Sequence, residues 1–223
     1  RMRFLMPFTV EKPGFSVGPS ILRAWANPFG PLGTPLVDTE GAGETIDNLL
    51  DALMQPELRL PKVLVLPLVR LNGPLVRMIR TMAMTRNLPV ATAERDRRPL
   101  LENGPDADGF LQDRLSPDDR ALLNAKWADL EAMGEVTYDV ARQAGDVRMR
   151  MEEFLALEAH GASSRKRNAL VTDRYRTAFA REAINNLAEV DSARIHTLNL
   201  NGEAIASVVI LMAMGEAFIW KAA

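Results

Sequence analysis

Residues 173–223 read DRYRTAFAREAINNLAEVDSARIHTLNLNGEAIASVVILMAMGEAFIWKAA, and this stretch decides the fold. Asp173 can accept hydrogen bonds from the free amides of a first helical turn, so a helix is predicted to begin directly after it. Apolar side chains then recur every four positions, which is typical of an amphipathic helix. The predicted buried face consists of Tyr175, Phe179, Ala183 and Leu187.

Three apolar strands are predicted to follow this helix. The first covers residues 195–200, and Asn201-Gly202 then provides the two residues that tolerate positive φ in a hairpin turn. The chain returns along residues 204–214, and Gly215-Glu216 turns it again into a strand at residues 217–221. The sequence therefore predicts an antiparallel sheet behind the helix.

The last predicted strand leads to an expectation about association. An apolar edge strand leaves backbone groups that invite pairing. We therefore expect residues 217–221 to be covered by the first half of the chain, by another chain or by a swapped partner, so that a homo-oligomer through strand edges is one outcome. Because no turn, helix or polar tail follows before Ala223, we also expect the chain to be a piece of a longer protein.

Composition narrows the functional classes. The 223 residues leave room for one large or two small domains, and 47% hydrophobic with 25% charged residues is ordinary for a soluble globular protein. A net charge of −2 gives no electrostatic case for nucleic-acid binding. The absence of cysteine excludes disulfides and thiolate chemistry and fits a cytoplasmic location. With only two histidines, the chain has few candidate ligands for a metal site. The longest uncharged apolar run, residues 205–214, is too short for a membrane helix.

The first half of the chain is predicted to mix strands and helices. Strands are predicted at residues 2–10, with Pro7 marking an edge or bulge, and at residues 21–26. Residues 63–71 form a continuous apolar run that indicates a strand covered on both faces, and a last strand is predicted at residues 89–94. Helices are predicted from Gly43 to the residue before Pro56, and from Pro74 onward.

The second half is predicted to begin after a Gly/Pro-containing boundary at residues 103–106. Ser116-Pro117 predicts a helix start, and that helix continues to Gly134. Residues 136–140 alternate as a strand, and Asp146 is predicted to cap a helix that Gly161 ends. The sequence thus predicts a mixed α/β (α+β) fold with domains at residues 1–103 and 104–223.

Several segments resemble a known family. The segments MEEFLALE, RNAL, FARE, RIHTL and FIWK, which begin at residues 151, 167, 179, 194 and 218, resemble the C-terminal domain of CelD-like members of the GNAT acyltransferase superfamily. These are bacterial proteins often linked to cellulose or exopolysaccharide biosynthesis. Residues 34–38, TPLVD, and the helix after them resemble the preceding domain of the same proteins. The resemblance implies a mixed GNAT-like sheet flanked by helices, with the back half of a first domain in residues 1–103 and the front half of a second in residues 104–223.

The resemblance also implies an activity. GNAT-like proteins transfer an acyl group, commonly acetyl from acetyl-CoA or another acyl-CoA, to an amine or hydroxyl, and a polysaccharide precursor is one acceptor that the CelD-like resemblance suggests. Gly41 and Gly43 lie where the superfamily places its phosphate-binding loop, and glycines there would let the backbone approach an anion. Three nearby carboxylates, Asp38, Glu40 and Glu44, should repel a pyrophosphate, so a flexible helix entry is the alternative interpretation.

Four residues of the second half are candidates for the site that the resemblance implies. Glu158 and His196 are the titratable groups expected nearest the acceptor, because a base must deprotonate it. Trp220 and Lys221 lie on the final predicted strand, where the cofactor should bind. The structural alternatives are a buried, hydrogen-bonded His196 and a core Trp220, while His160 is expected to cap a helix end.

Two functions therefore follow from the sequence. The first is an acyl-CoA-dependent acyltransferase. The second is a non-catalytic GNAT-like interaction module of an exopolysaccharide biosynthesis system, favoured by the carboxylates around the glycines of the first half.

Overall fold

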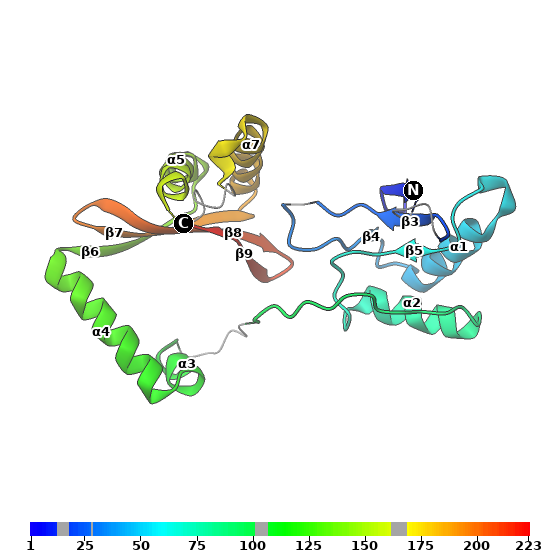
Figure 1. Cartoon of the computed structure of the whole chain (residues 1–223), viewed down its shortest axis with the longest axis horizontal. Helices are drawn as coiled ribbons and strands as arrows, with labels where there is room; N and C mark the ends of the chain where they lie inside the picture. The colour runs from blue at the N-terminus through cyan, green and yellow to red at the C-terminus, as the bar shows by residue number, and fades with distance from the viewer. Residues whose placement is uncertain (13–17, 28, 101–106, 162–168) are drawn as a thin grey trace. The chain divides into compact units, whose positions relative to one another are not determined.

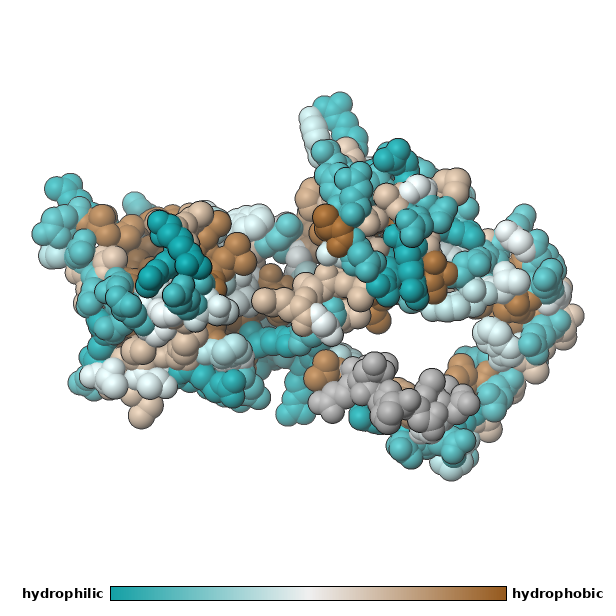
Figure 2. Space-filling model, turned by 180° about the vertical axis from the view of Figure 1, so that it is seen from behind, coloured by the Kyte–Doolittle hydropathy of each residue, from teal (hydrophilic) through white to brown (hydrophobic). Residues whose placement is uncertain are grey.

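The computed structural model describes residues 1–12, 18–27, 29–100, 107–161 and 169–223 (Figure 1). The chain divides into two compact units, Arg1–Arg98 and Pro99–Ala223. The boundary predicted at residues 103–106 lies outside the described residues. Hydrophobic residues reach the surface in separate places on both units (Figure 2).

In its described residues, the first unit contains short strands and two α-helices. β1 pairs antiparallel with β4, while β3 pairs antiparallel with β2 and parallel with β5. The elements are β1 (Phe4–Leu5), β2 (Phe8–Glu11), β3 (Ile21–Ala24), β4 (Leu36–Val37), α1 (Ala42–Met54), η2 (Pro56–Leu58), β5 (Leu64–Val65) and α2 (Pro74–Thr85). The helix predictions are confirmed, and the buried side chains include Leu22, Ala24, Ile46, Leu75 and Ala83.

Two strand predictions in this unit are wrong in extent, and a third is wrong altogether. The single strand predicted at residues 2–10 is two strands, β1 and β2, with Pro7 between them, because proline cannot donate to a ladder. The strand predicted at residues 63–71 is only Leu64–Val65 and is half-buried, since Pro67 removes a donor and Leu68 turns the chain at φ 52°. The strand predicted at residues 89–94 is absent from this described segment, and Val90 there is exposed.

The second unit is built on one four-stranded antiparallel sheet in the order β6-β7-β8-β9. α5 and α7 lie together on one face of this sheet (Figure 1), which we call the inner face. The elements are α3 (Ala107–Arg114), α4 (Pro117–Met133), β6 (Val136–Ala141), α5 (Ala144–His160), η3 (Leu170–Thr172), α7 (Arg174–Glu189), β7 (Ala193–Leu200), β8 (Glu203–Ala213) and β9 (Glu216–Ala222). The mixed α/β fold predicted from the sequence is confirmed.

The turns between these strands follow the local sequence closely. Asn201 and Gly202 have φ values of 52° and 81°, as the predicted hairpin turn requires. The next turn is formed by Met214 and Gly215, at φ 51° and 77°, one residue earlier than predicted. Glu216 is therefore the first residue of β9 rather than part of the turn.

The caps of two helices confirm the sequence analysis. The Asp173 carboxylate accepts hydrogen bonds from the amides of Tyr175 and Arg176 at 2.8 and 3.1 Å. Ser116 Oγ accepts from the Asp119 amide at 3.1 Å, directly before Pro117 opens α4. For α5 the cap prediction is wrong: Gln143 precedes the helix, and Asp146 lies within its first turn.

The buried face of α7 differs from the predicted one. Thr177, Ala180, Ile184 and Ala188 are buried, whereas Tyr175 is 70% and Phe179 40% exposed. α7 packs against α5. Small residues on the contact face allow close helix approach, so the stripe with the largest side chains is not the stripe that faces the core.

The inner face of the sheet holds the core of this unit. Ile195 and Val209 face the helices, where Met151 and Phe154 of α5 and Ile184 of α7 are fully buried. This packing fixes α5 over the sheet, and α5 carries one of the predicted site residues, Glu158.

Gly134, between α4 and β6, is predicted to be sensitive to substitution. The Asn201 amide oxygen accepts from Glu135 N at 2.9 Å, and a Cβ on Gly134 would lie 2.1 Å from that oxygen. We expect G134A to lose this hydrogen bond and to lower the free energy of unfolding by about 1–2 kcal/mol, measured by urea denaturation. The matched control is G145A in α5, where a Cβ meets nothing within 4 Å and stability should be unchanged or slightly raised. Equal stabilities of the two variants would contradict this account.

Candidate functional site

Glu158 is the most completely buried charged group in the described parts of the second unit. Its side chain is 0% exposed, and it lies on the same stripe of α5 as Met151, Phe154 and Leu155. One carboxylate oxygen forms an ion pair with Lys221 Nζ, and the other accepts a hydrogen bond from Leu170 N at 2.8 Å. The carboxylate therefore connects α5, η3 and β9.

Lys221 reaches this carboxylate because of its register in the sheet. It lies opposite Val209, whose side chain is fully buried on the inner face. The Lys221 side chain remains 26% exposed, so its ammonium is close to both Glu158 and solvent. The structure thus brings together two of the residues that sequence analysis named separately.

Trp220 lies beside Lys221 at an irregular position of β9. In the β8–β9 ladder, Val209 pairs with Lys221 and the next residue, Ile210, pairs with Ile219. The register shifts between these two pairs, so Trp220 lies between the two residues of β9 that pair with Val209 and Ile210. The Trp220 side chain is half-buried.

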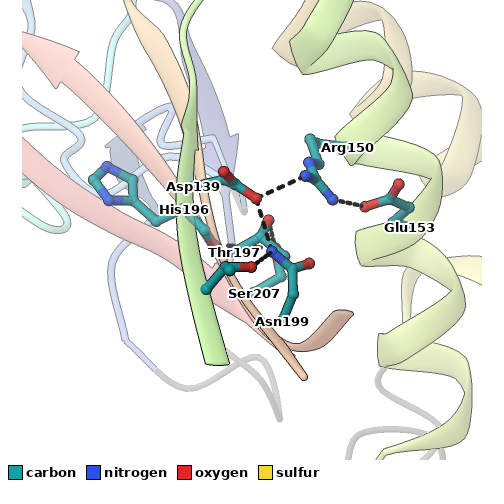
Figure 3. A network of polar contacts seen from close by, with 8 residues as sticks. Asp139, Arg150, Glu153, His196, Thr197, Asn199 and Ser207 are labelled. Carbon is teal, nitrogen blue, oxygen red and sulfur yellow. Dashed lines mark hydrogen bonds and ion pairs between the residues drawn. The ribbon is translucent and has the colours of Figure 1, made fainter. Parts of the chain in front are cut away.

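His196 lies on the opposite face of the sheet, which we call the outer face. Its Nδ1 is 2.5 Å from the Tyr138 hydroxyl on β6. Figure 3 shows the His196 ring on the other side of the strands from Arg150 of α5. Glu158 and His196 therefore do not share one cleft in this structure, because successive residues of β7 point to opposite faces and Ile195 and Thr197 face the helices.

The surroundings of His196 favour its neutral form. Partial burial lowers the pKa of His196 below its ordinary value of 6.5, and the positive charges of Arg194 and Arg142 lower it further. A neutral imidazole can accept a proton, so the group has the protonation state that a general base needs at neutral pH.

A shallow hollow adjoins His196 on the outer face. Its volume is about 270 Å³, and its lining consists of Tyr138, His196, Leu198, Ala206, Ser207, Val208 and Ile210. Tyr138 and His196 provide polar groups at an otherwise largely apolar surface.

Sequence analysis missed a polar network on the inner face. Asn199 donates from Nδ2 to Asp139 at 2.7 Å, and Arg150 of α5 donates to the same carboxylate oxygen at 3.0 Å (Figure 3). Arg150 also bonds Glu153 at 2.6 Å. The signal was present in β7, where Thr197 and Asn199 occupy alternate positions after Ile195 on the face that proves to be buried.

Gly41 and Gly43 lie in the first unit. Gly41 has φ 67° and precedes α1 without a side-chain cap, and a Cβ on Gly43 would make an ordinary contact with Met82. Of the carboxylates expected to repel an anion, Asp38 and Glu40 pair with Arg1 at 2.9 and 2.8 Å, and Glu44 lies 3.7 Å from Arg3. These arginines partly offset the local negative charge.

Two further observations concern metals and membranes. In the described parts of the chain, no group of three or more His, Cys, Asp or Glu side chains is placed to hold a metal ion. None of the helices in those same parts combines the length and the apolarity that crossing a bilayer requires.

Comparison with known proteins found one family to which most of the second unit is similar. Residues 118–223, which run from α4 through β9, match the model of a family described as acetyltransferase (GNAT) domain. This part of the chain is thus similar to GNAT acetyltransferase domains, and domains of this class generally transfer acyl groups from acyl-CoA to an acceptor. Searches of curated proteins and of solved structures gave no significant match.

The Glu158–Lys221 pair is predicted to stabilise the second unit asymmetrically. K221M leaves a carboxylate in a fully buried position, whereas E158Q leaves an ammonium that still reaches solvent. We expect K221M to lower the free energy of unfolding by about 3 kcal/mol and E158Q by about 1–2 kcal/mol. Urea denaturation of the single variants and of E158Q/K221M should show that the double variant loses less than the sum of the singles. Additive losses would mean that the two side chains do not interact.

His196 is predicted to make stability depend on pH. The unfolded ring has the ordinary pKa of 6.5 and the folded ring a lower one, so below that value the unfolded state binds more protons. The stabilisation of wild type relative to H196Q should therefore decrease as the pH falls from about 7 to about 5. Urea denaturation across this range measures the difference, and NMR titration of the His196 ring provides an independent check. A difference that is constant with pH would refute the lowered pKa.

Proposed function

We propose that the protein is an acyl-CoA-dependent acyltransferase that transfers acetyl or a related acyl group to an amine or hydroxyl. One observation carries the proposal: the match to the acetyltransferase (GNAT) domain covers residues 118–223, and this range contains the whole antiparallel sheet of the second unit with α5 and α7 on its inner face. The acyl donor would supply a thioester, and the chain's own residues would bind it and accept the proton that the acceptor loses.

His196 is the proposed general base. If Nδ1–H donates to the Tyr138 hydroxyl, Nε2 keeps its lone pair and can take a proton from the acceptor amine or hydroxyl. The lowered pKa of His196 keeps the ring neutral before this transfer. Tyr138 would hold the ring in one orientation.

Glu158 is proposed to act at the site by holding Lys221 in place. Its carboxylate engages both Lys221 and the Leu170 amide, so it fixes the end of β9, where Trp220 and Lys221 are proposed to line the acyl-CoA site. The partly exposed ammonium of Lys221 fits an anionic donor. In the first unit, Gly41 and Gly43 are proposed to contact phosphate, and the missing side-chain cap on α1 fits this role.

The resemblance to CelD-like proteins supports two finer proposals. The acceptor would be a polysaccharide precursor, and residues 1–103 and 104–223 would be parts of two GNAT-like domains in tandem. Strands and helices occur on both sides of residues 103–106, and this supports the proposal of two GNAT-like domains in tandem.

A non-catalytic interaction module of an exopolysaccharide system is the second candidate. It is favoured by the positions of the two titratable candidates, since Glu158 is fully engaged on the inner face while His196 lies on the outer face. This separation does not exclude catalysis, because an acyltransferase site would need only one of the two residues as its base.

Two measurements on the full chain separate these functions. Calorimetric titration with acetyl-CoA tests binding, and release of free CoA thiol in the presence of amine or sugar acceptors tests transfer. We expect wild type to bind acetyl-CoA and to release CoA, and we expect H196Q to bind normally but transfer about 100-fold more slowly. The matched control, H160Q, replaces the other histidine and should transfer at the wild-type rate. Failure to bind or to turn over acetyl-CoA would favour the interaction module.

A further inference from the structure

The outer-face hollow has a mainly apolar floor. Leu198 of β7 and Ala206, Val208 and Ile210 of β8 contribute to it. Leu198 pairs with Ala206 and His196 pairs with Val208, so the hollow follows the β7–β8 ladder. A continuous apolar surface of this kind suits an alkyl chain, because burying alkyl carbon removes apolar area from water.

Positive charge borders this floor at one end. Arg194 precedes His196 by two residues on β7, so both side chains project from the outer face, and it pairs in register with Ile210. Arg142 follows β6, and its charge also acts on His196. No Asp or Glu is among the residues that line the hollow. Asp191 pairs with Arg194 and offsets part of this charge, while Arg142 adds to it, so the border favours an anion over a cation.

Arg194 has unused donor capacity. Its Nη2 lies 3.2 Å from both carboxylate oxygens of Asp191, but its Nε, which is buried, has no hydrogen-bond partner among the described residues. A buried donor without a partner is costly, and a carboxylate is one of the anionic groups to which an arginine forms strong, charge-assisted hydrogen bonds. The Arg194 side chain is 22% exposed, so part of it is accessible to a ligand from solvent.

We propose that the outer-face hollow binds a small amphipathic anion, an alkyl chain that carries a carboxylate. The chain lies along Leu198, Val208 and Ile210, and the carboxylate lies at Arg194. A volume of about 270 Å³ lies just below the usual range for ligand pockets, about 300 to 1,000 Å³, so the ligand is a short-chain acid rather than a long lipid. The proposal does not rest on the proposed acyl transfer, because it requires neither acyl-CoA nor the groups on the inner face, but His196, the proposed base, lines the same hollow.

Methyl NMR titration of the full chain tests the proposal. The probes are octanoate, 1-octanol as a neutral chain and octylammonium as a cationic chain, all below the concentrations at which they form micelles. We expect octanoate to shift the methyl resonances of Leu198, Val208 and Ile210 at the lowest concentration, 1-octanol to shift them more weakly and octylammonium to shift them least. Equal binding of the three probes, or octanoate shifts that leave these methyl groups unmoved, would overturn the proposal.

Variants separate the role of the charge from that of the apolar floor. R194Q should weaken octanoate binding at least fivefold and leave 1-octanol binding unchanged, while V208T should weaken both. The matched control is R148Q, an exposed arginine on α5, which should bind all three probes as wild type does. Because R194Q also loses the contact with Asp191, R142Q provides a second charge variant and should weaken octanoate binding to a smaller degree. Unchanged octanoate binding by both R194Q and R142Q would refute the anion site.

Discussion

The second unit depends on a buried ion pair between a helix and a strand. Glu158 of α5 has no exposed side-chain surface, and it satisfies its charge with Lys221 of β9 and the Leu170 amide. A buried carboxylate is tolerated only when its partners are in place, so α5, η3 and β9 must adopt one arrangement together. The apolar contacts of Met151, Phe154 and Ile184 with the sheet supply the larger stabilisation, but they are not directional. The ion pair adds a directional constraint.

The same sheet offers two chemically different faces. Its inner face combines an apolar centre with the polar network of Asp139, Asn199 and Arg150. Its outer face carries His196, Tyr138 and an open apolar hollow bordered by arginine. Alternation along β7 produces both faces from one strand. Lys221, which is proposed to hold the donor, and His196, which is proposed as the base, thus lie on different faces of the sheet. The identity of the base is therefore the central question for the acyltransferase proposal.

The observations that support the proposed acyltransferase function differ between the two units. The second has a family match over residues 118–223 and a regular sheet. The first has short strands, and its glycine loop is surrounded by carboxylates that pair with Arg1 and Arg3. Apart from Asp38, the side chains in these ion pairs are exposed or half-exposed, so the pairs contribute little to stability, yet they change the electric field that an approaching anion meets. Local neutralisation of this kind is compatible with phosphate binding at Gly41, where carboxylates alone would oppose it.

The sequence alone determined the features that depend on neighbouring residues. Asp173 and Ser116 cap their helices, and Asn201-Gly202 forms the hairpin turn. The apolar runs of β7, β8 and β9 form strands. Each of these features depends on interactions between residues that are close together in the sequence. The tertiary structure decided which faces meet. Packing selected the small-residue stripe of α7 over the stripe with Tyr175 and Phe179, and Pro67 with Leu68 ended β5 after two residues. The pairing of Glu158 with Lys221, 63 positions apart, and the separation of Glu158 from His196 depend on strand register and on the position of α5 over the sheet. Sequence spacing does not encode such distances, since they arise only when the elements pack.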